Sequence, residues 1–290
     1  FQPDDLTVVV QAGVSLDGLD DEIGTRRQTA VLPEVEPGAT VGGVVAVGLS
    51  AYRRLRYGPT RDRVLRVRIA TGYGTVVTGG SPVVKSSTGY GLPRLVTGSL
   101  GSLGMIGEVT LKLWSKPMSV ATVEVDDATA ALGALYRPLA VLETSEGSFA
   151  YLGGPEEQIA AECLKLGTVP LEGLAWPEPM AEPIQIEIRV PAVHLAGAAE
   201  WMQRLGAVRW RAQHGVGIVS GGLDEFDTNG FTAARTWAES VAGALVVTSG
   251  DVGSFDPWGS PPSSIEVQQR IKESFDPAGI CNPSILAGGI

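Results

Sequence analysis

Two glycine-rich segments constrain the fold of this sequence more than any other feature. The first runs from Pro37 to Gly43 (PGATVGG) and the second from Gly98 to Ile106 (GSLGSLGMI). Glycine has no Cβ, so its backbone N–H groups can come within hydrogen-bond distance of a ligand. Two such segments could line opposite sides of one elongated cofactor. The alternative is that both are turns between strands.

Neither segment carries a common nucleotide-binding fingerprint. The glycines of the second segment recur every three residues, which does not match the G-x-G-x-x-G pattern of doubly wound sheets. Neither segment ends in the Gly-Lys-Ser/Thr of a phosphate loop. The sequence therefore gives no support to nucleotide hydrolysis.

The charge balance excludes several partners. The chain has 22 basic and 32 acidic residues, a net charge of −10. Such a surface repels nucleic-acid backbones and anionic lipids, and no apolar run is long enough to span a membrane. Basic residues nevertheless cluster between residues 53 and 68, where they either hold one small anion or balance nearby carboxylates.

Cysteine and histidine are too few for a metal site or a disulfide framework. Cys163 and Cys281 show no ligand spacing, and His194 and His214 are the only histidines. The sequence therefore predicts no metal and, by default, a reducing cytoplasmic location.

Hydrophobic periodicity predicts an alternation of strands and helices. Val64–Ala70 alternates apolar residues with arginine, the period-2 pattern of a half-buried strand. Other predicted strands span 6–12, 75–78, 108–113, 119–125, 148–153, 184–190, 208–213, 217–220 and 244–248, and predicted helices span 16–24, 127–136, 193–205 and 231–242, with further helices after Gly154 and in the tail through Phe275. Residues 33–43 are predicted to be a loop.

The pattern changes character near residue 117. We therefore predict an α+β chain with a first domain at 1–117, a second at 118–254 and a returning tail at 255–290. The second domain is expected to be a sheet with helices on one face.

Three stretches, 39–62, 83–92 and 98–113, resemble the FAD-binding domain of the vanillyl-alcohol-oxidase and p-cresol-methylhydroxylase family. The run Arg53–Gly58 (RRLRYG) and the tail from Phe275-Asp276-Pro277 to Asn282-Pro283 are most similar to E subunits of bacterial glycolate oxidases. The resemblance implies a two-domain FAD-binding fold with a ferredoxin-like cap domain. It also implies a further glycine-rich loop before residue 1, so the N-terminal FAD subdomain is expected to be missing.

The resemblance also implies which residues bind FAD. The first segment would run beside the flavin and its pyrophosphate, and the second would line the ribityl and adenine side. Lys85 would stabilise the reduced flavin near N1, unless it is an exposed turn lysine. The complete set of implied cofactor-binding residues is Thr40, Val41, Gly42, Gly43, Ser50, Lys85, Gly98, Gly101, Ser102, Gly104 and Ile106.

Several polar residues that are usual in the family are replaced here. Gly48-Leu49-Ser50-Ala51 stands for the usual Asn-Ala-Ser-Gly, and Ser86, Gly91, Leu100 and Gly107 stand for Asn, Asp, Glu and Thr. These losses remove several polar partners near the cofactor and favour a non-catalytic role.

The candidate catalytic residues are one histidine and three arginines. His214 follows a predicted strand and precedes a Gly-Val-Gly turn, so it could act as the base that takes a hydroxyl proton. The alternative is a structural or solvent-facing histidine. Arg53, Arg56 and Arg211 could grip a substrate carboxylate bidentately, or form ordinary surface ion pairs.

The resemblance implies an FAD-dependent dehydrogenase that passes a hydride from a small 2-hydroxy acid, such as glycolate or lactate, to the flavin N5. An iron–sulfur partner subunit is expected, because this chain has no cluster-binding cysteine motif. The protein would be cytoplasmic and reach the inner membrane face only through its partners. The alternatives are a non-catalytic assembly subunit and a sugar-alcohol or aldonolactone oxidase.

Overall fold

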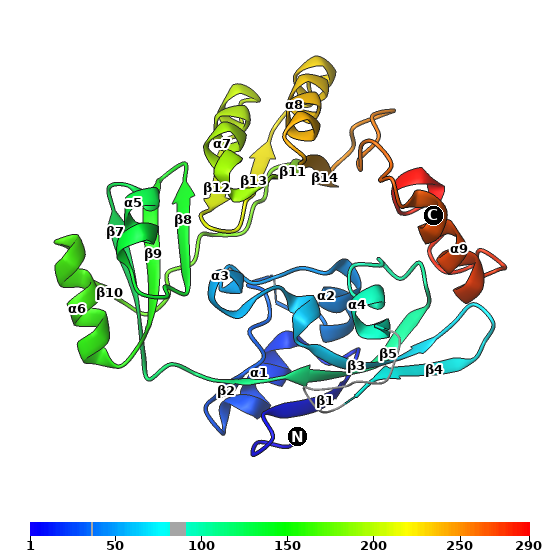
Figure 1. Ribbon diagram of the computed structural model, residues 1–290, viewed down its shortest axis with the longest axis horizontal. Helices are drawn as coiled ribbons and strands as arrows, with labels where there is room; N and C mark the ends of the chain where they lie inside the picture. Colours follow the sequence, from blue (N-terminus) through cyan, green and yellow to red (C-terminus); the bar gives the residue numbers. More distant parts are fainter. Residues whose placement is uncertain (36, 82–90) are drawn as a thin grey trace. The chain divides into compact units, whose positions relative to one another are not determined.

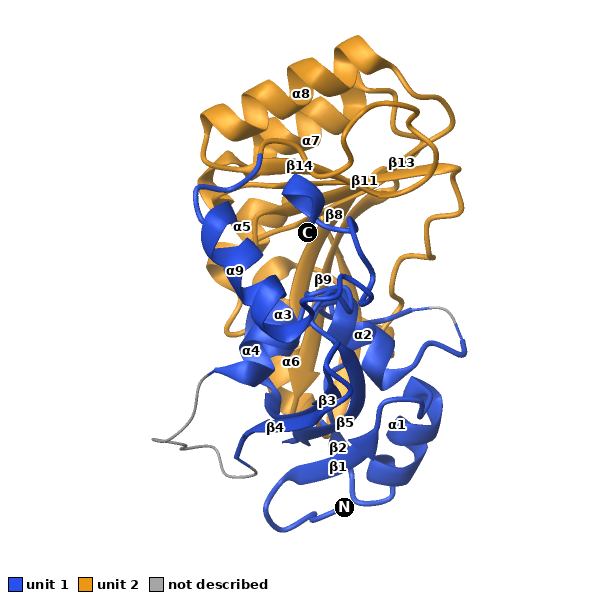
Figure 2. Ribbon diagram, turned by 90° about the vertical axis from the view of Figure 1, so that its right-hand side faces the viewer, with its two compact units in different colours: residues 1–116, 261–290 blue, residues 117–260 orange. Residues whose placement is uncertain are grey.

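The computed structural model describes residues 1–35, 37–81 and 91–290. It divides into two compact units, Phe1–Lys116 with Pro261–Ile290 and Pro117–Ser260 (Figure 2). The second unit extends six residues beyond the domain end predicted at residue 254. Two contacts hold residues 255–260 in that unit: the N–H of Val247 donates to Pro257 O (2.8 Å), and the Phe255 ring packs edge-on against Phe231 (5.8 Å between centroids).

Unit 1 is built on an antiparallel four-stranded sheet. Its strand order is β1-β5-β3-β4, formed by β1 (Thr7–Gln11), β5 (Met105–Lys112), β3 (Val64–Ala70) and β4 (Val76–Gly80) (Figure 1). A small second sheet pairs β2 (Gln28–Thr29) with β6 (Trp114–Ser115). The strand predicted at residues 64–70 is confirmed, although a register shift after Val64 interrupts its alternation.

The described part of unit 1 contains five α-helices. They are α1 (Leu16–Gly24), α2 (Val41–Val47), α3 (Arg54–Tyr57), α4 (Leu92–Val96) and α9 (Ile265–Phe275), with 3₁₀ turns at Thr60–Asp62 and Ala287–Gly289. Ser15 caps α1 by accepting a hydrogen bond from Gly18 N (3.1 Å). The apolar face of α1 joins that of α2 and the sheet in one core that includes Ile23, Val45 and Leu111.

Unit 2 contains the same strand–helix–strand–strand–helix–strand motif twice. The first copy consists of β7 (Ser119–Val125), α5 (Ala128–Ala134), β8 (Ala140–Thr144), β9 (Gly147–Gly154), α6 (Glu156–Leu166) and β10 (Leu171–Glu172). The second consists of β11 (Ile184–Arg189), α7 (Leu195–Arg204), β12 (Arg209–Gln213), β13 (Ile218–Leu223), α8 (Thr228–Ser240) and β14 (Ala244–Ser249), with a 3₁₀ turn at Ala192–His194. Each copy has its fourth strand beside the first, the ferredoxin-like arrangement that was predicted.

The two copies form one continuous sheet. Strand β8 of the first copy pairs antiparallel with β12 of the second, which gives the order β10-β7-β9-β8-β12-β13-β11-β14. Figure 1 shows α7 and α8 over the strands of the second copy. Ile186, Ile188, Trp210 and Phe231 are part of the core between those helices and strands. Neither the duplication nor strand β8 was predicted from the sequence.

A linker, residues 173–183, connects the two copies across the face of the sheet opposite to the helices. Tyr151 lies between the core residues Ala150 and Leu152 in β9, so its side chain points to the opposite face of the sheet. Its hydroxyl donates a hydrogen bond to Ala175 O of the linker (3.1 Å). The Trp176 ring stacks on Tyr151 at 4.1 Å. The linker therefore covers part of the surface that the helices leave open.

Candidate functional site

Helix α2 contacts both glycine-rich segments, one at each end. Thr40 caps its start, because the Thr40 hydroxyl accepts a hydrogen bond from Gly43 N (3.2 Å). At the other end, Val45 O and Ala46 O accept hydrogen bonds from Gly98 N (3.0 Å) and Leu100 N (2.8 Å). A helix of seven residues is about 10 Å long. The two segments thus lie at opposite ends of one short helix.

Residues 41–43 form the first turn of this helix, so the prediction of a loop through Gly43 was wrong for them. The N–H groups of Val41 and Gly42 donate to Val14 O (2.9 Å) and Ala12 O (2.8 Å). A Cβ at Gly42 would lie 2.5 Å from the Ala12 Cβ. These two N–H groups therefore hold the start of α2 against the residues that follow β1. Only glycine at position 42 lets the helix come this close to Ala12.

The second segment has a left-handed backbone at several positions. Gly98, Leu100 and Gly101 have φ values of 86°, 52° and 76°. Among the described residues, the N–H groups of Gly101 and Leu103 donate no hydrogen bond. An added Cβ at Gly101 would meet open space.

Two buried hydroxyls of this segment, those of Ser99 and Ser102, likewise have no partner in the described part of the chain. The free N–H groups beside them suit a ligand rich in oxygen atoms, such as a dinucleotide. The remaining predicted positions differ in their surroundings: Gly104 is buried against Ala70 O, and Ile106 is half-buried in β5. The second segment therefore suits FAD because it offers hydrogen-bond donors. The first suits FAD because its glycines have no side chains and allow a close approach.

Ser50 and Lys85 completed the predicted cofactor set. The Ser50 hydroxyl accepts a hydrogen bond from Thr60 N (3.1 Å), so it holds the chain that leaves α2 to the 3₁₀ turn before β3. Lys85 and Ser86 lie outside the described residues.

Arg63 is a residue that the sequence did not distinguish from its basic neighbours. Its side chain is buried, and its Nη1 donates to Gly58 O (2.7 Å) and Tyr57 O (3.3 Å). Burial, with Arg53 nearby, lowers the pKa of Arg63 to about 10. The guanidinium is therefore charged at neutral pH and binds backbone carbonyls in place of a carboxylate.

The arginines predicted to bind substrate all have contacts within the chain. Arg53 forms an ion pair with Glu34 (3.0 Å), and Arg56 lies near the Tyr57 ring, 5.9 Å from its centroid. Arg211, in unit 2, is buried and donates to Glu178 O of the linker (2.6 Å). These contacts match the alternative of structural arginines.

His214 lies between the two copies of the motif in unit 2. Its Nε2 is 3.0 Å from Glu143 Oε2, and its Nδ1 is 3.5 Å from the Thr129 hydroxyl of α5. Its backbone N–H donates to Val141 O (2.9 Å). The ring is therefore on the helix-covered side of the sheet, where it connects β8 to the end of β12.

We expect His214→Gln to lower the free energy of unfolding of unit 2 by about 1 kcal/mol, the usual scale for one buried hydrogen bond. The same substitution should change turnover by less than about twofold. Denaturant unfolding and steady-state kinetics of the full chain measure the two effects. His194→Gln, at an exposed histidine, is the matched control. Turnover that falls by orders of magnitude only in His214→Gln would instead identify His214 as the base.

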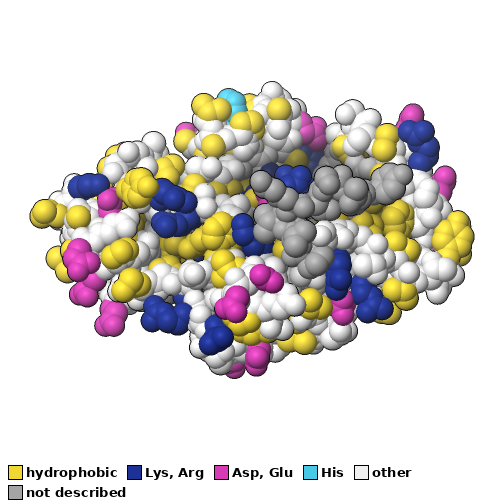
Figure 3. Space-filling model, turned by 60° about the horizontal axis from the view of Figure 1, so that its bottom comes forward, with side chains coloured by type: hydrophobic (Ala, Val, Ile, Leu, Met, Phe, Trp, Pro, Cys, Tyr) yellow, Lys and Arg dark blue, Asp and Glu magenta, His cyan; other side chains and the backbone are white. Residues whose placement is uncertain are grey.

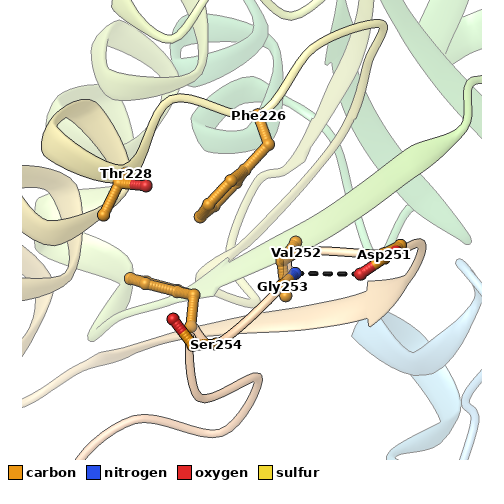
Figure 4. Close-up of a pocket in the computed structure, with 7 residues that line it drawn as sticks. Phe226, Thr228, Asp251, Val252, Gly253 and Ser254 are labelled. Carbon is orange, nitrogen blue, oxygen red and sulfur yellow. Dashed lines mark hydrogen bonds between the residues drawn. The ribbon is translucent and has the colours of Figure 1, made fainter.

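A separate pocket lies at the start of α8, lined by Phe226, Thr228, Asp251, Val252, Gly253, Ser254 and Phe255 (Figure 4). Its one ionisable side chain, Asp251, accepts a hydrogen bond from Gly253 N (2.9 Å). Within residues 1–35, 37–81 and 91–290, no cluster of His, Cys, Asp and Glu could hold a metal ion. The glycine-rich site in unit 1 is therefore the better candidate.

The surface carries both signs of charge. Figure 3 shows acidic and basic side chains interspersed on the face that it views. Among the helices that the structure describes, none has both the length and the apolar character needed to cross a bilayer.

Comparisons with known proteins agree with this geometry. A family of FAD-binding domains matches residues 1–80. Glycolate oxidase subunit GlcE of Escherichia coli K12 is 27% identical over 98% of this chain and 82% of its own length. The D-lactate dehydrogenase of Anaerostipes hadrus is 37% identical over 42% of this chain, but the match covers only 26% of that enzyme.

A solved structure of alkyldihydroxyacetonephosphate synthase is similar in fold, with a TM-score of 0.64 at 16% identity. The match covers 98% of this chain and 66% of that one. Residues 1–80 therefore match an FAD-binding domain, and the chain is similar over nearly its whole length to a glycolate oxidase subunit in sequence and to alkyldihydroxyacetonephosphate synthase in fold.

Proposed function

We propose that this chain is the FAD-binding subunit of a dehydrogenase that oxidises a small 2-hydroxy acid. The observation that carries the proposal is that the two glycine-rich segments contact the two ends of one helix, and that among the described residues the N–H groups of Gly101 and Leu103 donate no hydrogen bond. The relatives named above act, by their names, on glycolate and D-lactate, which are both 2-hydroxy acids. Unit 1 would hold the cofactor, and unit 2 would be the substrate domain.

Residues of unit 1 would bind the cofactor through backbone groups. The N–H groups of Gly101 and Leu103 would donate to cofactor oxygens, and the exposed Gly43 and Gly98 would let the cofactor approach α2. When bound, FAD supplies a two-electron acceptor for the hydride of the substrate α-carbon. The substrate carboxylate would need an arginine that can grip it bidentately, and Arg56, beside the Tyr57 ring, is a candidate in unit 1.

A second candidate is a subunit that binds FAD without oxidising a substrate itself. It is favoured by the contacts of the proposed catalytic side chains, since Arg53 is paired with Glu34 and His214 with Glu143. Such a subunit would depend on a partner for turnover.

An anaerobic titration of the full chain distinguishes these two candidates. The protein is loaded with FAD, and glycolate or D-lactate is added while the flavin absorption is followed. We expect the absorption to bleach with one of these acids, because the flavin accepts the hydride. Bound flavin that stays oxidised with every 2-hydroxy acid would contradict the dehydrogenase proposal and support the second candidate.

The proposal includes an iron–sulfur partner subunit and a cytoplasmic location. It is supported by the two unclustered cysteines, which cannot hold a cluster in this chain. Co-purification of the natural protein with an iron-containing subunit is the expected result. A natural protein that passes electrons directly to oxygen, with no partner, would instead favour the sugar-alcohol or aldonolactone oxidase alternative.

A further inference from the structure

The C-terminal tail holds the second glycine-rich segment by two side chains. Lys272, in the last turn of α9, donates to Ser102 O (2.7 Å), and the side-chain amide of Asn282 donates to Leu100 O (2.6 Å). The tail also contacts the end of the β3–β4 hairpin, where Gly72 N donates to Phe275 O (3.0 Å). Both bonds from the tail end on backbone carbonyls of the cofactor segment.

The Lys272 ammonium has no donor left for a ligand. Besides Ser102 O, it donates to Asp276 Oδ2 (2.6 Å) and Cys281 O (2.7 Å), which uses all three of its N–H groups. Asp276 is itself buried and also accepts hydrogen bonds from Cys281 N (2.7 Å) and Ile280 N (3.1 Å). Lys272 is therefore a positioning group and does not contact the cofactor.

Asp276 keeps this network charged at neutral pH. Burial alone would raise the pKa of its carboxyl, but the bonds from Lys272 and from the amides of Cys281 and Ile280 outweigh burial and lower it below the usual value. The carboxylate is thus ionised wherever the enzyme works near neutrality, and the Lys272 ammonium keeps its partner.

Peptide geometry connects the tail to the free N–H groups. In a trans peptide the N–H points opposite to the carbonyl of the preceding residue. When Leu100 O and Ser102 O face the tail, the N–H groups of Gly101 and Leu103 must face away from it. These are the two N–H groups that lack an acceptor among the described residues.

Leu100 shows that the segment needs to be held. Its φ of 52° is left-handed, a conformation that is unfavourable for a residue with a Cβ. Its N–H is fixed by Ala46 O of α2 (2.8 Å), and its carbonyl by Asn282. A strained residue persists only when its surroundings determine it from both sides.

We infer that the tail is a clamp that orients the Gly101 and Leu103 amides toward FAD, with Lys272 and Asn282 as its positioning residues. The inference rests on the proposed binding of FAD in unit 1. It implies that FAD affinity depends on two side chains that do not touch the cofactor.

The test compares Lys272→Met and Asn282→Asp in the full chain with Arg270→Met, at an exposed position of the same helix. We expect both clamp variants to raise the Kd for FAD at least tenfold, and the control to leave it unchanged. Without FAD, hydrogen exchange at the Leu100 amide should accelerate at least tenfold in the clamp variants, while the amides of β5 keep their rates. A merely structural effect would accelerate both regions.

Clamp variants with a Kd within twofold of wild type, or with unchanged exchange at Leu100, would overturn the inference. The exchange measurement needs no cofactor, so it decides even for a chain that binds FAD poorly. A chain that binds FAD through an intact clamp, yet is never bleached by 2-hydroxy acids, would instead contradict the proposed function alone.

Discussion

Gly42→Ala is expected to lower the free energy of unfolding of unit 1 by about 2–3 kcal/mol and to weaken FAD binding with it. The added methyl group would lie 2.5 Å from Ala12 Cβ and 2.9 Å from Ala12 O, so α2 must move away from β1. Overpacking of this kind costs about 1–3 kcal/mol, and the move also stretches the bond from Gly42 N to Ala12 O. The gain of about 1 kcal/mol from alanine's helix propensity is too small to reverse the sign.

Gly43→Ala, one residue further along, is the matched control. Gly43 is exposed, and an added Cβ would meet only the Thr40 hydroxyl at 3.2 Å, so stability should stay constant or rise slightly. Denaturant unfolding followed by the fluorescence of Trp114, the only tryptophan of unit 1, gives the free energies. If Gly43 faces the cofactor, its variant should weaken FAD binding at constant stability. Equal stability of both variants would contradict the docking role of Gly42.

Arg63→Met should destabilise unit 1 by about 2–4 kcal/mol. Methionine keeps an unbranched apolar side chain but leaves the carbonyls of Tyr57 and Gly58 and the Thr60 hydroxyl, which lies 3.4 Å from Nη2, without their donor. Each buried polar group that loses its partner costs about 1–3 kcal/mol. Removal of the desolvation penalty, which lowers the pKa of Arg63 to about 10, offsets part of this loss.

Trp114 reports on this change as well, because its ring lies 5.2 Å from that of Tyr57. Arg61→Met, at an exposed arginine of the same turn, should leave the unfolding curve unchanged. A loss below about 1 kcal/mol in Arg63→Met would show that the loop from Tyr57 to Thr60 is held by other contacts.

Much of the fold was predictable because its determinants are local. The alternation of Val64–Ala70 and the apolar faces of α1 and α7 depend on residues only a few positions apart, so their elements were placed within a few residues of their bounds. Strand β8 was missed because its five residues include three consecutive buried ones and show no alternation. The pairing of β8 with β12, which joins the two copies in unit 2, depends on residues about 70 positions apart.

The site divides in the same way. FAD was predicted as the cofactor from the resemblance of two glycine-rich segments and the tail motif to a known family, all of them short runs of sequence. The partners of the charged residues could not be predicted from the sequence. Six arginines lie between residues 53 and 66, and only the fold shows that Arg63 is buried and that Arg53 pairs with Glu34. The sequence gives the sign of each charged side chain, but the partner of that side chain depends on contacts between segments that are distant in the sequence.

By itself, the sequence determined where glycines leave the backbone without side chains and which hydrophobic patterns form strands and helices. The tertiary structure alone decided that Val41–Val47 is a helix, because Gly42 lets it dock against Ala12 at the end of β1. It also decided that the tail fixes Leu100 and Ser102, since Lys272 reaches its acceptor across 170 residues of chain. Such contacts form only after the chain has folded, and no local pattern encodes them.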